Sequence, residues 1–224
     1  SGLRYDHTLM DVYKFYRTSF WESRNYDQLF SELVIREVNA QTLINTEINF
    51  NNISGTIGFK NNSAKYTSFF NYSIASRAPN PSELFSEGLH HSSARIELGD
   101  LSFKSEIGHK FSYTLQRNEE KFTISINPYY NIVKDFLVLE PTSVQTSIRG
   151  SYQVWEYRQT NANLFGLDID ATIALSKKLS FNHKSSIVKG YDRILKIPLI
   201  NMPPVNTQNE IIYENKNFKS IKIK

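Results

Sequence analysis

The 224-residue chain carries 26 Lys and Arg against 22 Asp and Glu, a formal net charge of +4, and it has no cysteine. The lack of cysteine excludes disulfides and thiolate metal sites. The basic residues are scattered rather than interleaved with aromatics, which excludes a nucleic-acid groove. The 13 Tyr and 15 Phe on a polar background favour β-strands, and no apolar run approaches the roughly 18 residues that a membrane-spanning helix needs.

The opening segment, "SGLRYDHT", has the pattern of a strand and no initiator Met. We therefore expect the chain to be an excerpt from a longer protein. For residues 9–51 we expect a long loop, followed by a weakly alternating strand at residues 53–59.

The segments that follow alternate apolar and polar residues with a period of two. The clearest are residues 65–75, 107–116, 122–132, 165–175 and 179–187, with weaker copies at 205–213 and 218–224. A period of two places each set on one face of a strand. The polar break at residues 117–120 predicts a hairpin.

The connections between these strands alternate in length. Short turns are expected at residues 61–64, 117–120, 176–178 and 215–217, and long loops near 9–51, 78–103, 139–152 and 193–204. Short turns on one side and long loops on the other are typical of an outer-membrane barrel. The sequence therefore predicts an all-β fold, an antiparallel up-and-down transmembrane β-barrel, of which about nine strands are present.

About nine strands leave two unpaired edges, which the hydrocarbon region does not tolerate. We expect either an incomplete wall or edges that pair with another chain. The alternative from another class is a soluble or surface β-sandwich that binds carbohydrate or mediates adhesion, in which two sheets pack face to face.

The barrel hypothesis also predicts which side chains face lipid. Thr123, Ser125, Asn127, Asp168 and Asp170 are expected to face a wet lumen. The lipid-facing set is predicted to be Phe122, Ile124, Ile126, Tyr130, Phe165, Leu167 and Ile169.

Two motifs, in order along the chain, make the hypothesis more specific. "SRAPNPSELF" has Arg77-Ala78-Pro79 followed by Glu83-Leu84-Phe85, and "GDLSFKSE" follows at residues 99–106. These motifs resemble the barrel of TonB-dependent outer-membrane receptors, as do "INPYYNIVKDFLVLEPT" and "WEYRQTNANLFGLDIDA" farther on. The second motif departs from the family pattern, because it lacks the Asn-Pro pair and the Pro before Glu106.

The resemblance implies a barrel of roughly 22 strands around a plugged lumen. Residues 1–224 would be part of that one barrel domain, with the plug domain and the remaining strands outside this sequence. The iron-complex receptors of the Bacteroidetes lineage are the most similar type. The implied function is import of a ferric siderophore or related iron complex, in the outer membrane, by active transport coupled to the TonB complex through the plug. Haem receptors and glycan importers of the same family are alternatives, although a glycan importer would carry more Trp than Trp21 and Trp155.

Candidate ligand-binding residues lie in the loop after the first motif. Arg77 and Arg95 suit an anionic chelate, because a guanidinium fork matches clustered oxygens. His90 and His91 could ligate a metal or haem iron, although no second ligand set completes a shell, so no metal site is assigned. Glu83, Glu97 and Glu106 are expected to form structural ion pairs at the loop base, and Asp168 and Asp170 to line the lumen.

Motifs of catalysis are absent from the sequence. There is no Gly-rich phosphate loop, G-x-S-x-G or H-E-x-x-H. The sequence therefore predicts a transporter with no cofactor rather than an enzyme, with lipid, cargo and the TonB complex as partners.

Overall fold

The structure is a computed structural model that describes residues 1–148, 150–215 and 218–223. Within these residues, nine strands follow one another in one sheet, in the order β1-β3-β4-β7-β8-β9-β10-β12-β13. Their bounds are β1 (Gly2–Arg17), β3 (Gln41–Asn62), β4 (Tyr66–Arg77), β7 (Glu106–Asn118), β8 (Phe122–Ser147), β9 (Gly150–Ala174), β10 (Leu179–Asp192), β12 (Asn206–Asn215) and β13 (Phe218–Ile223). Except for Asn215, the turn predicted at 215–217 lies outside the described residues, as do Arg149 and Lys224.

The sheet is an open, antiparallel wall. Its consecutive strands pair antiparallel from β1 to β13, and β1 and β13 do not pair with each other in the described part of the chain. The prediction of an incomplete barrel wall is therefore confirmed. The β-sandwich alternative is wrong, because the strands belong to one hydrogen-bonded sheet rather than to two packed sheets.

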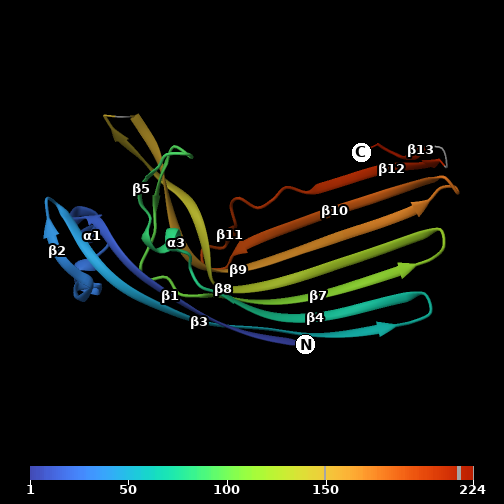
Figure 1. The fold of residues 1–224 in the computed structure, drawn as a ribbon, viewed down its shortest axis with the longest axis horizontal. Coiled ribbons are helices and arrows are strands. Elements are labelled where there is room, and N and C mark those ends of the chain that lie inside the picture. The colour runs from blue at the N-terminus through green and yellow to red at the C-terminus, as the bar shows by residue number, and fades with distance from the viewer. Residues whose placement is uncertain (149, 216–217, 224) are drawn as a thin grey trace.

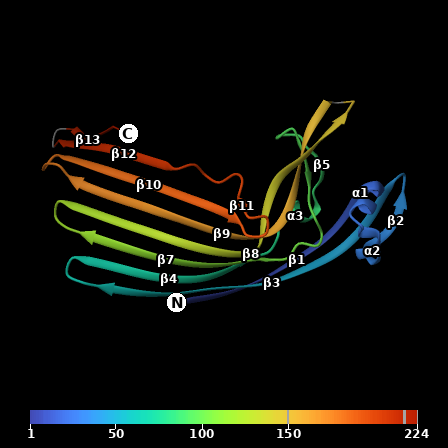
Figure 2. The ribbon, with the colours of Figure 1, turned by 180° about the vertical axis from the view of Figure 1, so that it is seen from behind.

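Short elements gather at one end of the wall (Figures 1 and 2). We call this the loop end, and the opposite end, with the tight turns after β3, β7 and β9, the turn end. The elements at the loop end are α1 (Thr18–Ser23), α2 (Tyr26–Leu29), η1 (Ser31–Leu33), β2 (Val34–Val38), α3 (Pro81–Phe85), β5 (Glu87–His90), β6 (Arg95–Leu98) and β11 (Ile197–Pro198). No helix among the described residues combines the length and the apolar character that crossing a membrane would require.

The wall has one apolar and one polar face toward the turn end. On the apolar face, Phe70 lies beside Tyr113, and Tyr130 lies between Phe111 and Phe165. On the polar face, Ser125 pairs with Asp170 and Asn127 with Asp168. The two sets predicted for β8 and β9 thus lie on opposite faces, because the register is unbroken from Phe122 to Val133.

The first long loop is shorter than the predicted 9–51. β1 continues to Arg17 and β3 begins at Gln41, with the two strands paired throughout. The pattern hid this pairing because the apolar face of β3 changes sides: Ile53, Ile57 and Phe59 are exposed, whereas Ile44 and Ile48 pack into a core on the other face. When the apolar positions of a strand shift from even to odd residue numbers, a search for one continuous alternation finds an irregular segment in its place.

The segment predicted as a loop at 139–152 is mostly strand. β8 and β9 remain paired up to Ser147 and Gly150, well beyond the end of their pairing with β7 and β10. A bulge after Val133 carries Asp135 at φ 55°, and it bends β8 where the hairpin leaves the wall. Strand β6 then pairs in parallel with β9, so the β4–β7 connection reaches across to a strand that follows it in sequence (Figure 2).

Candidate functional site at the loop end

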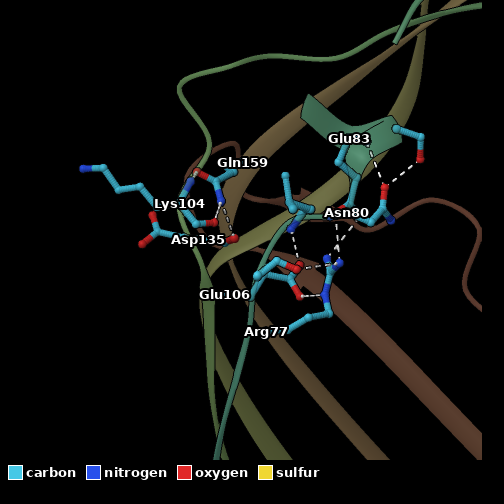
Figure 3. A network of polar contacts seen from close by, with 10 residues as sticks. Arg77, Asn80, Glu83, Lys104, Glu106, Asp135 and Gln159 are labelled. Carbon is cyan, nitrogen blue, oxygen red and sulfur yellow. Dashed lines mark hydrogen bonds and ion pairs between the residues drawn. The ribbon is translucent and has the colours of Figure 1, made fainter. Parts of the chain in front are cut away.

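Arg77 links the end of β4 to two other segments (Figure 3). Its Nη1 and Nη2 donate to the two carboxylate oxygens of Glu83 at 2.9 and 3.1 Å, and its Nε donates to Glu106 Oε2 at 2.8 Å. Both glutamates are largely buried, whereas the Arg77 side chain is about half exposed. Together the two carboxylates raise the pKa of Arg77, above all through the bond to Glu106. The predicted loop-base ion pairs thus meet on one guanidinium, which we call the Arg77 clamp.

The helix after the clamp begins at the proline pair. Asn80 caps α3 by accepting from the Glu83 backbone N–H at 3.0 Å, while the Glu83 carboxylate accepts from the Asn80 N–H at 2.7 Å. This is a capping box with Pro81 at the first helical position. Glu83 therefore serves the helix start and the clamp at once, which fixes the direction in which the loop leaves β4.

A second set of polar contacts secures the bulge of β8. Glu106 Oε1 accepts from the Leu137 N–H at 2.5 Å, and Gln159 Nε2 donates to the carbonyls of Lys104 and Asp135 (Figure 3). The side-chain oxygen Oε1 of Gln159 in turn accepts from the Lys104 N–H. These bonds satisfy backbone groups that the bulge removes from the ladder.

Aromatic residues from the end of β1 and from the first loop form an apolar core at the loop end. Tyr16, Trp21 and Tyr26 are almost fully buried, with ring centroids 5.5 Å apart for the first pair and 5.1 Å for the second. Tyr26 Oη donates to Asp100 Oδ1 at 3.0 Å and accepts from the Leu101 N–H. Burial and the neighbouring Asp100 raise the pKa of Tyr26. The full core, called the aromatic cap, is Tyr16, Phe20, Trp21, Tyr26, Ile44, Leu84, Phe85, Leu101, Phe103 and Leu137.

Two ion pairs connect the end of β1 and the first loop to later strands. Arg17 Nε donates to Glu87 Oε1 at 2.6 Å, and Arg24 Nη2 donates to Glu156 Oε2 at 3.1 Å. Because Glu87 opens β5 and Glu156 lies on β9, these pairs fasten the cap to both sides of the loop end.

The predicted ligand residues His90 and Arg95 lie side by side on the β5–β6 hairpin. They are register partners, and Arg95 in turn lies beside Gln153 of β9. The Arg95 guanidinium sits 5.0 Å from the centre of the Trp155 ring and donates from Nε to Glu97 at 2.7 Å. This row of imidazole, guanidinium and indole, which we call the hairpin row, is the strongest candidate for a ligand-contact surface in the described residues.

The histidine pair lies at the hairpin tip. His90 and His91 are exposed, and His90 Nδ1 lies 3.1 Å from the hydroxyls of both Ser92 and Ser93. The described residues contain no group of three or more His, Cys, Asp or Glu arranged to hold a metal ion. The pair therefore has the hydrogen bonding of an ordinary tight turn.

Asp168 and Asp170 lie apart from this site, on the polar face. Asp168 accepts from the Ser186 hydroxyl at 2.7 Å, and Asp170 pairs with Lys184 at 3.2 Å. They border a hollow of about 390 Å³ that Ser125 and Asn127 also line. This face is wettable, as expected of a lumen wall.

A partly buried charge cluster was not foreseen from the sequence. Arg158 donates to both oxygens of Glu140 at 3.0 and 2.9 Å and to Asp192 Oδ2 at 2.8 Å. Asp192 is buried and also accepts from the Thr160 hydroxyl. Acid–base pairs separated by 18 and 34 residues carry no local sequence signal, so only the sheet register brings them together.

The model of the TonB-dependent receptor-like β-barrel family matches residues 1–210. The chain belongs to this family. The resemblance predicted from "SRAPNPSELF" and the following motifs is thereby confirmed, and members of the family are outer-membrane β-barrels that act as receptors and transporters. A comparison with curated proteins found no match.

Solved structures of receptors share the fold. The copper transporter OprC superposes with a TM-score of 0.64 at 20% identity, over 77% of this chain and 25% of its own. The siderophore receptor PirA from Pseudomonas aeruginosa gives 0.57 at 12% identity, over 78% of this chain and 34% of its own. The FrpB iron transporter from Neisseria meningitidis superposes with a TM-score of 0.53 at 15% identity, over 79% of this chain and 27% of its own. The chain thus spans about a quarter to a third of the length of these receptors.

Proposed function

We propose that this chain is part of the wall of an outer-membrane receptor that imports a metal complex by TonB-coupled active transport, with a ferric siderophore as cargo. The observation that carries the proposal is the family match over residues 1–210. The neighbouring receptors, named for copper, siderophore and iron, support a metal-containing cargo. A plug domain outside these residues would link the wall to the TonB complex, and the Bacteroidetes-like type stays a prediction.

The loop end supports capture from outside. Its β5–β6 hairpin lies at the loop end of the wall (Figure 1), where β6 pairs with β9, and the hairpin row lies on one side of it. The other side borders a hollow of about 210 Å³ lined in part by Arg17, Leu89 and Ile96. Protruding, rigidly anchored loops with a few placed polar groups are typical of binding surfaces.

Among the predicted ligand residues, Arg95 is the stronger candidate. Arg77 already gives its Nε, Nη1 and Nη2 groups to two carboxylates, so it acts as a structural clamp. Arg95 engages Glu97 through Nε and stacks on Trp155, a combination that suits an anionic chelate carrying aromatic rings.

Haem is the second candidate cargo. The exposed His90 and His91 favour it, because an imidazole nitrogen ligates haem iron. A glycan importer is less favoured, since Trp21 is buried in the aromatic cap and the hairpin row contains a single Trp, Trp155.

The test uses the full-length receptor in an iron-starved host that lacks competing receptors. Arg95→Gln with Trp155→Leu is expected to reduce growth on a ferric siderophore, whereas His90→Gln with His91→Gln leaves it unchanged. A haem receptor gives the reverse result together with a lost Soret shift. Arg4→Gln is the matched control, since Arg4 is highly exposed and pairs only with Asp6 nearby. Unchanged uptake of both cargoes in all variants would remove this hairpin from the binding site.

A further inference from the structure

The apolar face of the wall carries basic but no acidic side chains between the turn end and the β8 bulge. Among the described residues, the acids in this part of β4, β7, β8, β9 and β10 all lie on the polar face. They are Glu106, Asp168, Asp170 and Asp192. At the loop-end border of the apolar face lie three cations, which we call the border cations: Lys134, Lys189 and Arg193.

The strand register places two of the border cations on the apolar face. Lys134 lies opposite Ile107 of β7, and Lys189 lies opposite Phe165 of β9. Phe165 in turn pairs with Tyr130 of β8. Because register partners share a face of the sheet, both cations lie on the side that carries these apolar residues.

Arg193 extends this border past the end of β10. Its N–H donates to the Asn161 carbonyl at 2.7 Å, so the ladder between β9 and the chain after β10 continues by one residue. Asp192, directly before it, is buried and lies on the polar side. Successive side chains of a strand alternate between the faces, and Arg193 therefore lies on the apolar face.

The border cations lie where the apolar band ends. On β8 the band runs from Phe122 to Ile132, ten residues later. With a rise of about 3.3 Å per residue and a strand tilt of about 40°, this stretch spans about 25 Å, the usual height of an outward apolar band. Lys134 is the next residue on the same face, about 5 Å beyond the band. Lys189 lies lower, beside Phe165, and its long stem lets the ammonium reach the same level.

The charges of the border cations are not neutralised by the protein around them. All three side chains are exposed. No ion pair or side-chain hydrogen bond joins them to another described residue, and this includes Asp135, which follows Lys134. By contrast, Arg77 and Arg158 at the same end each bind two carboxylates. The arginines that hold the loop end together are paired, whereas the border cations can bind a partner outside the wall.

The border cations lie within the sheet rather than at its free edges. Strand β8 pairs with β7 and β9, and strand β9 pairs with β8 and β10. Strand β10 has β9 on one side and β12 on the other, with β11 beside its last two residues. The exposure of the border cations therefore comes from the face on which they lie.

We propose that the border cations bind the phosphate groups of a lipid headgroup in the outer leaflet of the membrane. Ammonium and guanidinium groups bind phosphate oxygens strongly, and basic residues beside a hydrocarbon layer attract anionic headgroups. The apolar face supplies the second half of the match, since Ile132 and Phe165 lie where the acyl chains of that lipid would run. A free anion or an acidic protein segment would use the cations alone.

This inference rests on the proposed function, because it requires the wall to span the outer membrane with the loop end outward. A cysteine at Phe70, an exposed position of the apolar face, tests that location by itself. In intact outer membranes, Phe70→Cys is expected to react with a lipid-soluble reagent and not with a water-soluble one. If it reacts only with the water-soluble reagent, the proposed location fails, and the lipid site fails with it.

The lipid site is tested with the full-length receptor in a nonionic detergent. Fluorescently labelled bisphosphorylated lipid A is the probe, and binding is followed by fluorescence anisotropy. The triple variant Lys134→Gln, Lys189→Gln, Arg193→Gln is expected to weaken binding by at least about tenfold. Added salt is expected to weaken binding by the unmodified receptor, because the cations are exposed.

The matched control removes three exposed lysines from the polar face, namely Lys60→Gln, Lys110→Gln and Lys184→Gln. It changes the net charge equally and is expected to bind the lipid as tightly as the unmodified receptor. The heat-dependent gel mobility of barrels shows separately whether both triple variants are folded.

Each other result overturns the lipid site. Equal affinity for a dephosphorylated lipid A shows that the headgroup charge is not recognised, and equal losses in the two triple variants show a general charge effect. Inorganic phosphate that displaces the probe at comparable concentration assigns the cations to a free anion, and an acidic protein retained through them assigns them to a protein contact. If Phe70→Cys reacts with the lipid-soluble reagent while the border-cation variant binds normally, only this inference fails and the membrane location stands.

Discussion

The two halves of the wall place their apolar side chains on opposite faces. Toward the turn end, Phe59 and Phe70 point away from the polar face that carries Asp168 and Asp170. Toward the loop end, Ile44 and Ile48 of the same β3 strand point to the other side, where they pack on the aromatic cap. The apolar side chains of a strand face the side on which they have an apolar partner. Toward the turn end that partner is the surroundings of the wall, and toward the loop end it is the protein's own loops.

The loop end is therefore a small domain core built on a barrel wall. It has buried aromatics, the capped helix α3 and ion pairs between distant segments, whereas the turn end has strand pairing and an exposed apolar face. We expect the two halves to respond differently to mutation.

The largest difference is expected from Trp21→Ala. Truncating a fully buried Trp costs about 3–5 kcal/mol, and Trp21 is 1% exposed within the aromatic cap. The loop end should lose protection in hydrogen exchange, while the amides of β4 and β7 near the turn end keep theirs. Phe70→Ala on the apolar face is the control, and it should leave loop-end exchange unchanged. Equal loss of protection in both halves would show that the wall and the cap unfold as one unit.

A smaller effect is expected from Arg77→Met. The change leaves Glu83 and Glu106 close together without their shared cation. Loss of a buried pair costs 3–5 kcal/mol, which we reduce to about 2 kcal/mol because the Arg77 side chain is about half exposed. Proteolysis in the 78–105 connection should accelerate accordingly, whereas Arg4→Met, at an exposed pair, should have no effect. Unaltered proteolysis would mean that the cap alone holds the connection.

Toward the turn end, Gly166→Ala is expected to lower the free energy of unfolding by about 1–2 kcal/mol through a steric clash. A Cβ on Gly166 would lie 2.3 Å from the Tyr129 ring and 2.7 Å from the Ile187 carbonyl, so Gly166→Ala must displace that ring or the neighbouring strand. Urea unfolding in micelles should report the loss. Adding Tyr129→Ser should recover part of it, since the ring contact disappears, and a failure to recover would assign the cost to the Ile187 carbonyl.

The smallest effect on the protein is expected from spin labels, which report whether a strand position faces lipid or water. A label at Ile124 should be quenched by a lipid-soluble collider and one at Ser125 by a water-soluble one. At the loop end the pattern should differ, with a label at Glu47 exposed to water and one at Ile48 shielded from both reagents by the cap. Equal quenching at Ile124 and Ser125 would contradict the assignment of faces.

The sequence predicted the wall better than its loop end. Strict alternation located β4, β7 and the turn-end parts of β8 and β9. The motifs "SRAPNPSELF" and "GDLSFKSE" together indicated the family and contain the residues of the Arg77 clamp. The extension of β1 and β3 was missed because the phase of alternation reverses between Phe50 and Ile53, and a one-residue shift moves each side chain to the other face.

The rest of the loop end depends on contacts between distant segments. The hairpin row joins His90 and Arg95 to Trp155, and the charge cluster joins Arg158 to Asp192. No spacing rule connects such residues, because their proximity follows from the register of a bent β8–β9 hairpin and from the parallel pairing of β6.

That parallel pairing also dictates an order of folding. Strand β6 docks on residues 153–156 of β9, which emerge more than fifty residues after it in the chain. The connection between β4 and β7 therefore cannot take its final form until β7, β8 and β9 have been placed. In pulse-labelling during refolding, the amides of β5 and β6 should gain protection after those of β4 and β7, so the hairpin row is completed only after the wall beneath it has formed.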